Sequence, residues 1–119
     1  MSISPNDFIL IATDDLKYNT ESRDRNCISR SYYGLYHKAF NSMRHCLPTS
    51  HSGLIEYLNQ PYNRKQECQY DDMQLIQLSA ILKQQKRKRQ KADYKLDEEV
   101  TRTEAESSLG VCSKIMEKL

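Results

Sequence analysis

The sequence predicts an all-α fold, because helix-breaking residues are rare and apolar residues recur with helical spacing. Only three Gly and three Pro stand among 119 residues, and Trp is absent. Lys, Arg, Glu, Gln and Leu, which favour helices, are plentiful. Four amphipathic segments predict an up-and-down four-helix bundle with a short extra helix in the longest connection. A chain of this length suffices for one domain, residues 1–119, with one modest core.

The first two helices are predicted from a capping signal and from an apolar stripe. Ser4 followed by Pro5 is typical of an N-cap and a first helical position, and this helix should reach Leu16. The second helix should run from about Asp24 to Cys46, before the next proline. Its apolar stripe consists of Ile28, Tyr32, Leu35, Tyr36, Ala39 and Met43.

The second half of the chain predicts a long connection and two further helices. Residues 47–70 should be irregular, apart from one or two helical turns within 53–59. Asp71 or Asp72 should cap the third helix, which ends in a basic run. Asp97 should cap the fourth helix, with acidic residues in its first turn that suit the helix dipole.

Charge and hydropathy argue against a uniformly basic nucleic-acid-binding chain and against a membrane-spanning protein. The formal net charge is only +2, so any affinity for nucleic acid must come from where the positive charges lie. The longest apolar stretch, Phe8 to Ala12, is far shorter than the roughly 20 residues that span a bilayer. We therefore expect a soluble, cytoplasmic protein with no membrane partner.

The cysteines indicate reduced thiols rather than a disulfide framework. Cys27, Cys46, Cys68 and Cys112 lie far apart and form no Cys-x-x-Cys pair. A zinc site could be drawn from His45, Cys46, His51 and Cys68, but this spacing matches no structural zinc pattern. We expect neither a metal nor a cofactor.

Arg30 and His37 are the main candidates for chemistry. They stand seven residues apart, and at about 100° per residue this brings both side chains to one helix face, away from the apolar stripe. A permanently charged guanidinium aligned with an imidazole is suited to handling a phosphodiester. A solvated helix face is the alternative, but Tyr33, Gly34 and Asn41 share the row and offer phosphate or base contacts.

Three segments of the chain resemble HEPN domains. Residues 30–39, RSYYGLYHKA, resemble the helix in which an arginine, two aromatics, a small residue and a histidine recur. Residues 51–54, HSGL, are similar to the His-Ser-Gly turn that follows it. Residues 89–94, RQKADY, are similar to the basic Ala-Asp-Tyr segment between the last two helices. The matches occur in the family's order and extend the resemblance over about residues 5–119.

This resemblance implies metal-independent RNA cleavage by a toxin of a toxin–antitoxin pair or an anti-phage defence effector. Arg30 and His37 would be catalytic. Attack of a ribose 2′-hydroxyl on the adjacent phosphate needs a base, an acid and positive charge. HEPN proteins commonly form homodimers, and twofold pairing through the second helix would gather both subunits' catalytic pairs around one cleft.

Further residues are expected to bind or support RNA, and a second function is also possible for such a domain. The residues expected to bind or support RNA are Ser31, Tyr33, Asn41, Arg44, Lys86, Arg87 and Asp93. The basic run 83–91 holds six cations in nine residues and is either an RNA-attracting surface or a solvated helix end. Many HEPN ribonucleases carry Asn, Asp or His where this chain has Ser31. The rival is therefore a silent HEPN module that binds nucleic acid or a nucleotidyltransferase-type antitoxin.

Overall fold

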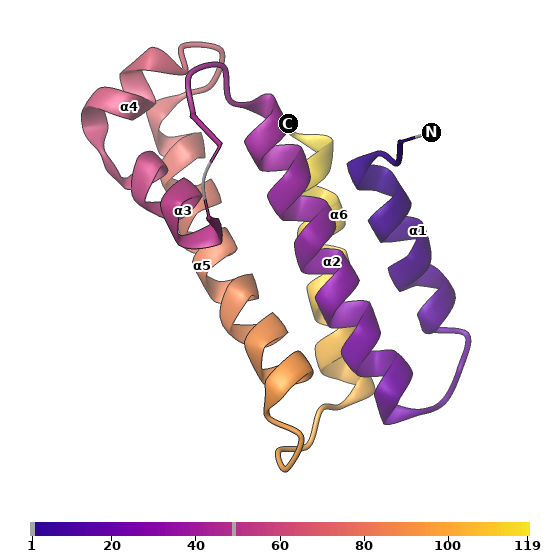
Figure 1. Ribbon diagram of the computed structural model, residues 1–119. Coiled ribbons are helices and arrows are strands. Elements are labelled where there is room, and N and C mark those ends of the chain that lie inside the picture. Colours follow the sequence, from indigo (N-terminus) through magenta and orange to yellow (C-terminus); the bar gives the residue numbers. More distant parts are fainter. Residues whose placement is uncertain (1, 49) are drawn as a thin grey trace.

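The computed structural model describes residues 2–48 and 50–119, and all regular structure in these ranges is helical. The helices are α1 (Pro5–Asp15), α2 (Glu21–Ser42), α3 (His51–Asn59), α4 (Pro61–Gln66), α5 (Asp72–Tyr94) and α6 (Arg102–Glu117). The predicted all-α class is confirmed. α2 is the central helix and packs against α1, α5 and α6, with α3 and α4 beside the first half of α5 (Figure 1).

The predicted start of α1 is confirmed. Ser4 is the N-cap, Pro5 opens the helix, and the Ser4 N–H donates to the Asp7 carboxylate at 2.7 Å. α1 then crosses α2 closely at Gly34, where a Cβ would lie 3.2 Å from the carbonyl oxygen of Pro5 and 3.2 Å from Ile9. The missing side chain therefore lets the α1 backbone approach α2.

α2 begins and ends earlier along the chain than the sequence predicts. Its N-cap is Thr20 and its last residue is Ser42. The buried carboxylate of Glu67 accepts hydrogen bonds from the backbone N–H groups of Arg44 at 2.6 Å and His45 at 2.9 Å. A side chain from a distant segment thus binds the chain after α2, and the helix stops before the proline expected to end it.

The long connection is more helical than the sequence predicts. Ser50 caps α3, and its hydroxyl accepts a hydrogen bond from the Gly53 N–H at 3.0 Å. Pro61 occupies the first turn of α4, a position that proline tolerates because its missing N–H needs no partner there. Two short helices replace the single extra helix that the sequence predicts.

The predicted start of the last helix is wrong. Asp97 lies in the turn after α5, and Thr101 caps α6 in a capping box in which the Thr101 N–H donates to Glu104 at 2.9 Å. The guanidinium of Arg25 donates to the carbonyl oxygens of Ala92 at 2.9 Å and Lys95 at 3.3 Å. A buried arginine from α2 therefore binds the end of α5, and the following residues form a turn rather than a helix.

The apolar stripe predicted for α2 is confirmed, since all six of its members are buried. Most of the core lies where this stripe meets α3, α5 and α6. Its largest fully buried aliphatic side chains are Leu35, Leu54, Leu58, Leu75 and Leu82. On the side away from the stripe, α2 packs against α1 and is partly exposed to solvent.

Cys27, Cys46, Cys68 and Cys112 are free, and the first and last are buried. Within 2–48 and 50–119, no group of three or more His, Cys, Asp or Glu side chains is placed to hold a metal ion. In the same ranges no helix has the length and apolar character needed to cross a bilayer.

An aromatic and cationic candidate active site

Five aromatic side chains form a closed ring of contacts between α1, α2 and the start of α3. Phe8 stacks on His37 with centroids 5.4 Å apart, and His37 meets Tyr36 at 5.2 Å. Tyr36 lies 4.0 Å from His51, and His51 lies 5.6 Å from Tyr33. Tyr33 returns to Phe8 at 6.3 Å. Two of the five rings are imidazoles, and we call this group the aromatic ring cluster.

Two guanidinium groups lie against the aromatic ring cluster. The Arg30 guanidinium carbon is 4.9 Å from the Tyr33 centroid and 5.8 Å from that of Phe8. The Arg89 guanidinium lies 5.6 Å from Tyr33 and 5.6 Å from Tyr32. The Tyr33 ring therefore contacts both cations, which favours each of them electrostatically.

The Asp93 carboxylate interacts with both arginines, directly with Arg89 and through the Ser29 hydroxyl with Arg30. Asp93 accepts a hydrogen bond from the Ser29 hydroxyl at 3.2 Å and lies 3.7 Å from Arg89. The Ser29 hydroxyl in turn accepts from Arg30 at 3.4 Å. The Arg89 side chain is only 9% exposed. The Nε atoms of both arginines are buried and find no acceptor in the described part of the chain. This excess of donors and positive charge favours an anion at the site.

His51 is held at the cluster by its neighbours. Its Nδ1 lies 2.9 Å from the hydroxyl of Tyr32, a buried core residue. Burial, followed by the positive charges of Arg89, Lys86 and His37, lowers the pKa of His51 below its ordinary value. The neutral imidazole is thus the favoured form of His51 near neutral pH.

Three of the predicted site residues meet in this cluster. Arg30 and His37 both contact Phe8, so they share one face of α2 as the spacing predicts. Tyr33 lies between them. None of the three is fully exposed, because α1 partly covers this face. Asp93 joins them through Ser29.

Three other predicted site residues, Ser31, Asn41 and Arg44, lie away from the aromatic ring cluster. Ser31 is completely buried beside the Cys27 thiol. It therefore lies on a different side of α2 from Arg30, the residue before it. Asn41 and Arg44 are exposed at and just after the end of α2. No hydrogen bond, ion pair or ring contact found in residues 2–48 and 50–119 connects Ser31, Asn41 or Arg44 to the aromatic ring cluster.

Lys86 and Arg87 line a groove next to the cluster. Lys86 Nζ donates to the hydroxyl of Ser52 at 2.6 Å, which joins α5 to the start of α3. The groove has a volume of about 330 Å³. Its lining residues are Ser52, Ile55, Glu56, Asn59, Lys83, Lys86, Arg87 and Gln90. Three cations against one carboxylate make this groove basic, and it begins beside His51.

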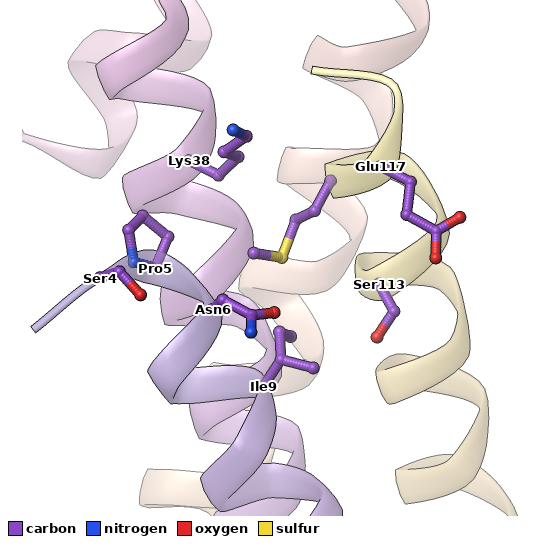
Figure 2. Close-up of a pocket in the computed structure, with 8 residues that line it drawn as sticks. Ser4, Pro5, Asn6, Ile9, Lys38, Ser113 and Glu117 are labelled. Atoms are coloured by element: carbon purple, nitrogen blue, oxygen red, sulfur yellow. The ribbon is translucent and has the colours of Figure 1, made fainter.

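A larger pocket of about 490 Å³ lies between α1, α2 and α6. Figure 2 shows that α1 and α6 form its opposite sides, with Lys38 of α2 at one edge and Glu117 of α6 at the other. Its remaining lining residues are Ser4, Pro5, Asn6, Ile9, Ser113 and Met116. Its lining includes no histidine and no arginine, so it lacks the imidazole and guanidinium groups that the cluster has.

Comparisons of this chain with protein-family models, curated proteins and solved structures give no match. The resemblance to HEPN domains therefore depends on the three short segments. In the structure these segments converge, although they are far apart in sequence. The first supplies Arg30 and His37 from α2, the second supplies His51 from α3, and the third supplies Arg89 and Asp93 from α5.

Sequence reasoning did not predict Phe8 and Tyr36 as members of this site, nor His51 and Arg89. His51 enters the sequence interpretation in the His-Ser-Gly turn and in the rejected zinc set, and Arg89 enters it in the basic run and in the RQKADY segment. Both lie inside segments that resemble HEPN domains, and this was the available signal. Their proximity to Arg30 and His37 depends on how α3 and α5 pack on α2.

Proposed function

We propose that this protein is a HEPN-type endoribonuclease that cleaves RNA without a metal ion. The observation that carries the proposal is the convergence of the three HEPN-like segments on one cluster. Two arginines and two histidines meet there, and the Asp93 carboxylate lies near Arg89 and is linked to Arg30 through Ser29. Such a cluster suits a substrate with a negatively charged phosphodiester.

The chemistry assigned to the cluster is attack of a ribose 2′-hydroxyl on the adjacent phosphate. Arg30 binds two phosphate oxygens with its planar fork and, with Arg89 behind it, stabilises the charge that develops in the transition state. His37 transfers a proton. The products are a 2′,3′-cyclic phosphate and a 5′-hydroxyl. DNA lacks the attacking group and is not cut.

The surroundings of the cluster offer contacts for the rest of an RNA strand. Phe8 and Tyr33 are partly exposed rings on which a base can stack. The groove lined by Lys83, Lys86 and Arg87 is suited to neighbouring phosphates. A single strand could thus place its reacting phosphate at Arg30 and continue along α5.

Fold and assembly follow the same family pattern in this proposal. α1, α2, α5 and α6 form a HEPN-type four-helix bundle, and α3 and α4 occupy its long connection. Two copies pair through α2, so that the Arg30 and His37 faces meet across a twofold axis. The cellular role is that of a toxin or an anti-phage defence effector.

The test is a cleavage assay in EDTA with structured and unstructured RNAs. We expect His37→Ala and Arg30→Ala each to lower the cleavage rate at least about 100-fold, the usual contribution of proton transfer or of one charge-stabilising group. His45→Ala removes an exposed histidine outside the cluster and should keep full activity. Product ends other than a cyclic phosphate and a 5′-hydroxyl would contradict the mechanism.

One observation favours a second function. Ser31 is buried in the core, so the cluster lacks the polar residue that follows the arginine in many HEPN ribonucleases. A silent HEPN module would bind nucleic acid or a nucleotidyltransferase partner and cut nothing. Wild-type protein that leaves every RNA intact while binding such a partner would select this alternative.

A further inference from the structure

Phosphodiester cleavage by a 2′-hydroxyl needs one group that accepts a proton and one that donates a proton. α2 contributes a single histidine, His37, to the site. A twofold dimer would supply another copy of the same residue. The structure offers a different source within one chain, and the inference below depends on the proposed endoribonuclease function.

His51 lies in the same cluster as His37. The Tyr36 ring contacts both imidazoles, at 4.0 Å from His51 and 5.2 Å from His37. Tyr33 contacts His51 at 5.6 Å and also lies under Arg30, the proposed phosphate-binding group. The two imidazoles therefore border the same aromatic surface beside the guanidinium.

We propose that His51 is the second proton-transfer group of the active site and that Tyr32 is its positioning residue. The Tyr32 hydroxyl oxygen and His51 Nδ1 lie 2.9 Å apart, and which of the two donates depends on the tautomer of His51. The proposed role assigns the proton of this hydrogen bond to Nδ1 of His51, which leaves the lone pair of Nε2 free to accept a proton. Nε2 has no hydrogen-bond partner among residues 2–48 and 50–119 and is not one of the buried unpaired atoms, and His51 is partly exposed, so Nε2 is accessible to substrate.

In the resulting step His51 is the base and His37 is the acid. Nε2 of His51 takes the proton of the 2′-hydroxyl while O2′ forms a bond to phosphorus. The bond from phosphorus to O5′ breaks, and O5′ takes a proton from the His37 imidazolium. A cyclic phosphate and a 5′-hydroxyl result, and solvent restores the two protonation states.

The charges around His51 suit a base. From α5 it faces Arg89 and Lys86, and from α2 it faces His37 together with three tyrosine rings. Burial, and then these cations, lower the pKa of His51 and keep it neutral near neutral pH. Tyr32 can accept the Nδ1–H bond both before and after proton transfer, because burial raises its pKa and keeps the phenol neutral.

The experiment measures single-turnover cleavage of an RNA oligonucleotide in EDTA from pH 4.5 to 8. Wild type is compared with His51→Ala, His51→Gln and the control His45→Ala. Wild type should lose activity on acidification with an apparent pKa below about 6.5, the ordinary value for histidine. Both His51 variants should be at least about 100-fold slower and should lack this acid limb, and added imidazole should partly restore His51→Ala.

The outcomes separate this inference from the proposed function. If His37→Ala is inactive while His51→Ala keeps wild-type activity and an unchanged acid limb, His51 has no role and only the inference is overturned. A slow His51→Ala with an unchanged acid limb and no imidazole rescue shows a structural role and also overturns it. Wild type that cleaves no RNA overturns both.

Discussion

The hydroxyl of Tyr32 and Nδ1 of His51 lie 2.9 Å apart, and this contact joins the core of α2 to the first residue of α3. Tyr32 is 1% exposed, so packing fixes its position. His51 is partly exposed at the aromatic ring cluster. A rigid core residue thus sets the orientation of a side chain at the candidate active site.

Tyr32→Phe removes this hydrogen bond and keeps the aromatic ring. We expect a loss of about 1 kcal/mol in the free energy of unfolding, the usual net value of one hydrogen bond. RNA cleavage should fall roughly tenfold because His51 can adopt either tautomer. Urea unfolding and single-turnover rates check the two effects. Unchanged cleavage with reduced stability would limit Tyr32 to a structural role.

Gly34 in α2 and Gly110 in α6 should respond in opposite ways to larger side chains. At Gly34 even a Cβ would lie 3.2 Å from the Pro5 carbonyl oxygen, so Gly34→Leu must push α1 and its Phe8 away from α2. We expect lower stability by about 1–3 kcal/mol and slower cleavage. Gly110 has open space around it in α6, so Gly110→Ala should raise stability by about 0.8–1 kcal/mol. Thermal and urea unfolding compare the two, and a stable Gly34→Leu would show that α1 can move freely.

Arg25→Ala should destabilise the turn between α5 and α6. The Arg25 guanidinium donates to four carbonyl oxygens, those of Lys91, Ala92, Lys95 and Glu98. Removing it takes away the group that joins these four carbonyl oxygens, although those of Lys91 and Lys95 keep backbone donors, and we expect a loss of about 2–3 kcal/mol. Lys17→Ala, which breaks an exposed ion pair, is the matched control and should cost less than about 0.5 kcal/mol. Equal losses in both variants would show that Arg25 does not hold this turn.

Glu67 should make stability depend on pH in the acid range. Burial alone raises its pKa, but hydrogen bonds from Tyr57, the Arg44 N–H, Gln69 and the His45 N–H together lower it below its ordinary value. The folded protein therefore binds this proton less readily than the unfolded chain. The stabilisation is complete above about pH 4.3 and is lost as the pH falls through the folded pKa. Unfolding at pH 7 and pH 3 should show this loss in wild type and a smaller loss in Glu67→Gln, and an equal loss in both would contradict it.

The basic groove should determine how RNA binding depends on salt. Replacing Lys83, Lys86 and Arg87 together by alanine removes the cations that line it. Each lost phosphate contact should reduce the slope of log K against log salt by about 0.7 for a single strand. Binding titrations from low to moderate salt measure this slope, with Lys114→Ala on α6 as the control. An unchanged slope would make the run a solvated helix end.

Boundaries that depend on local signals could be predicted, and boundaries set by distant residues could not. Ser4 and Pro5 begin α1 as the sequence predicts, because a cap acts within one turn. The end of α2 depends on Glu67, and the turn before α6 depends on Arg25. Both side chains reach these sites from other elements of the fold, so no local pattern contains the information.

The sequence by itself determined the helical class, the buried stripe of α2 and the shared face of Arg30 and His37. These follow from a fixed rotation per residue along one helix. Only the tertiary structure brought His51 and Arg89 to that face. The packing of α3 and α5 against α2 sets these positions, because such contacts depend on the shapes of side chains from separate parts of the chain.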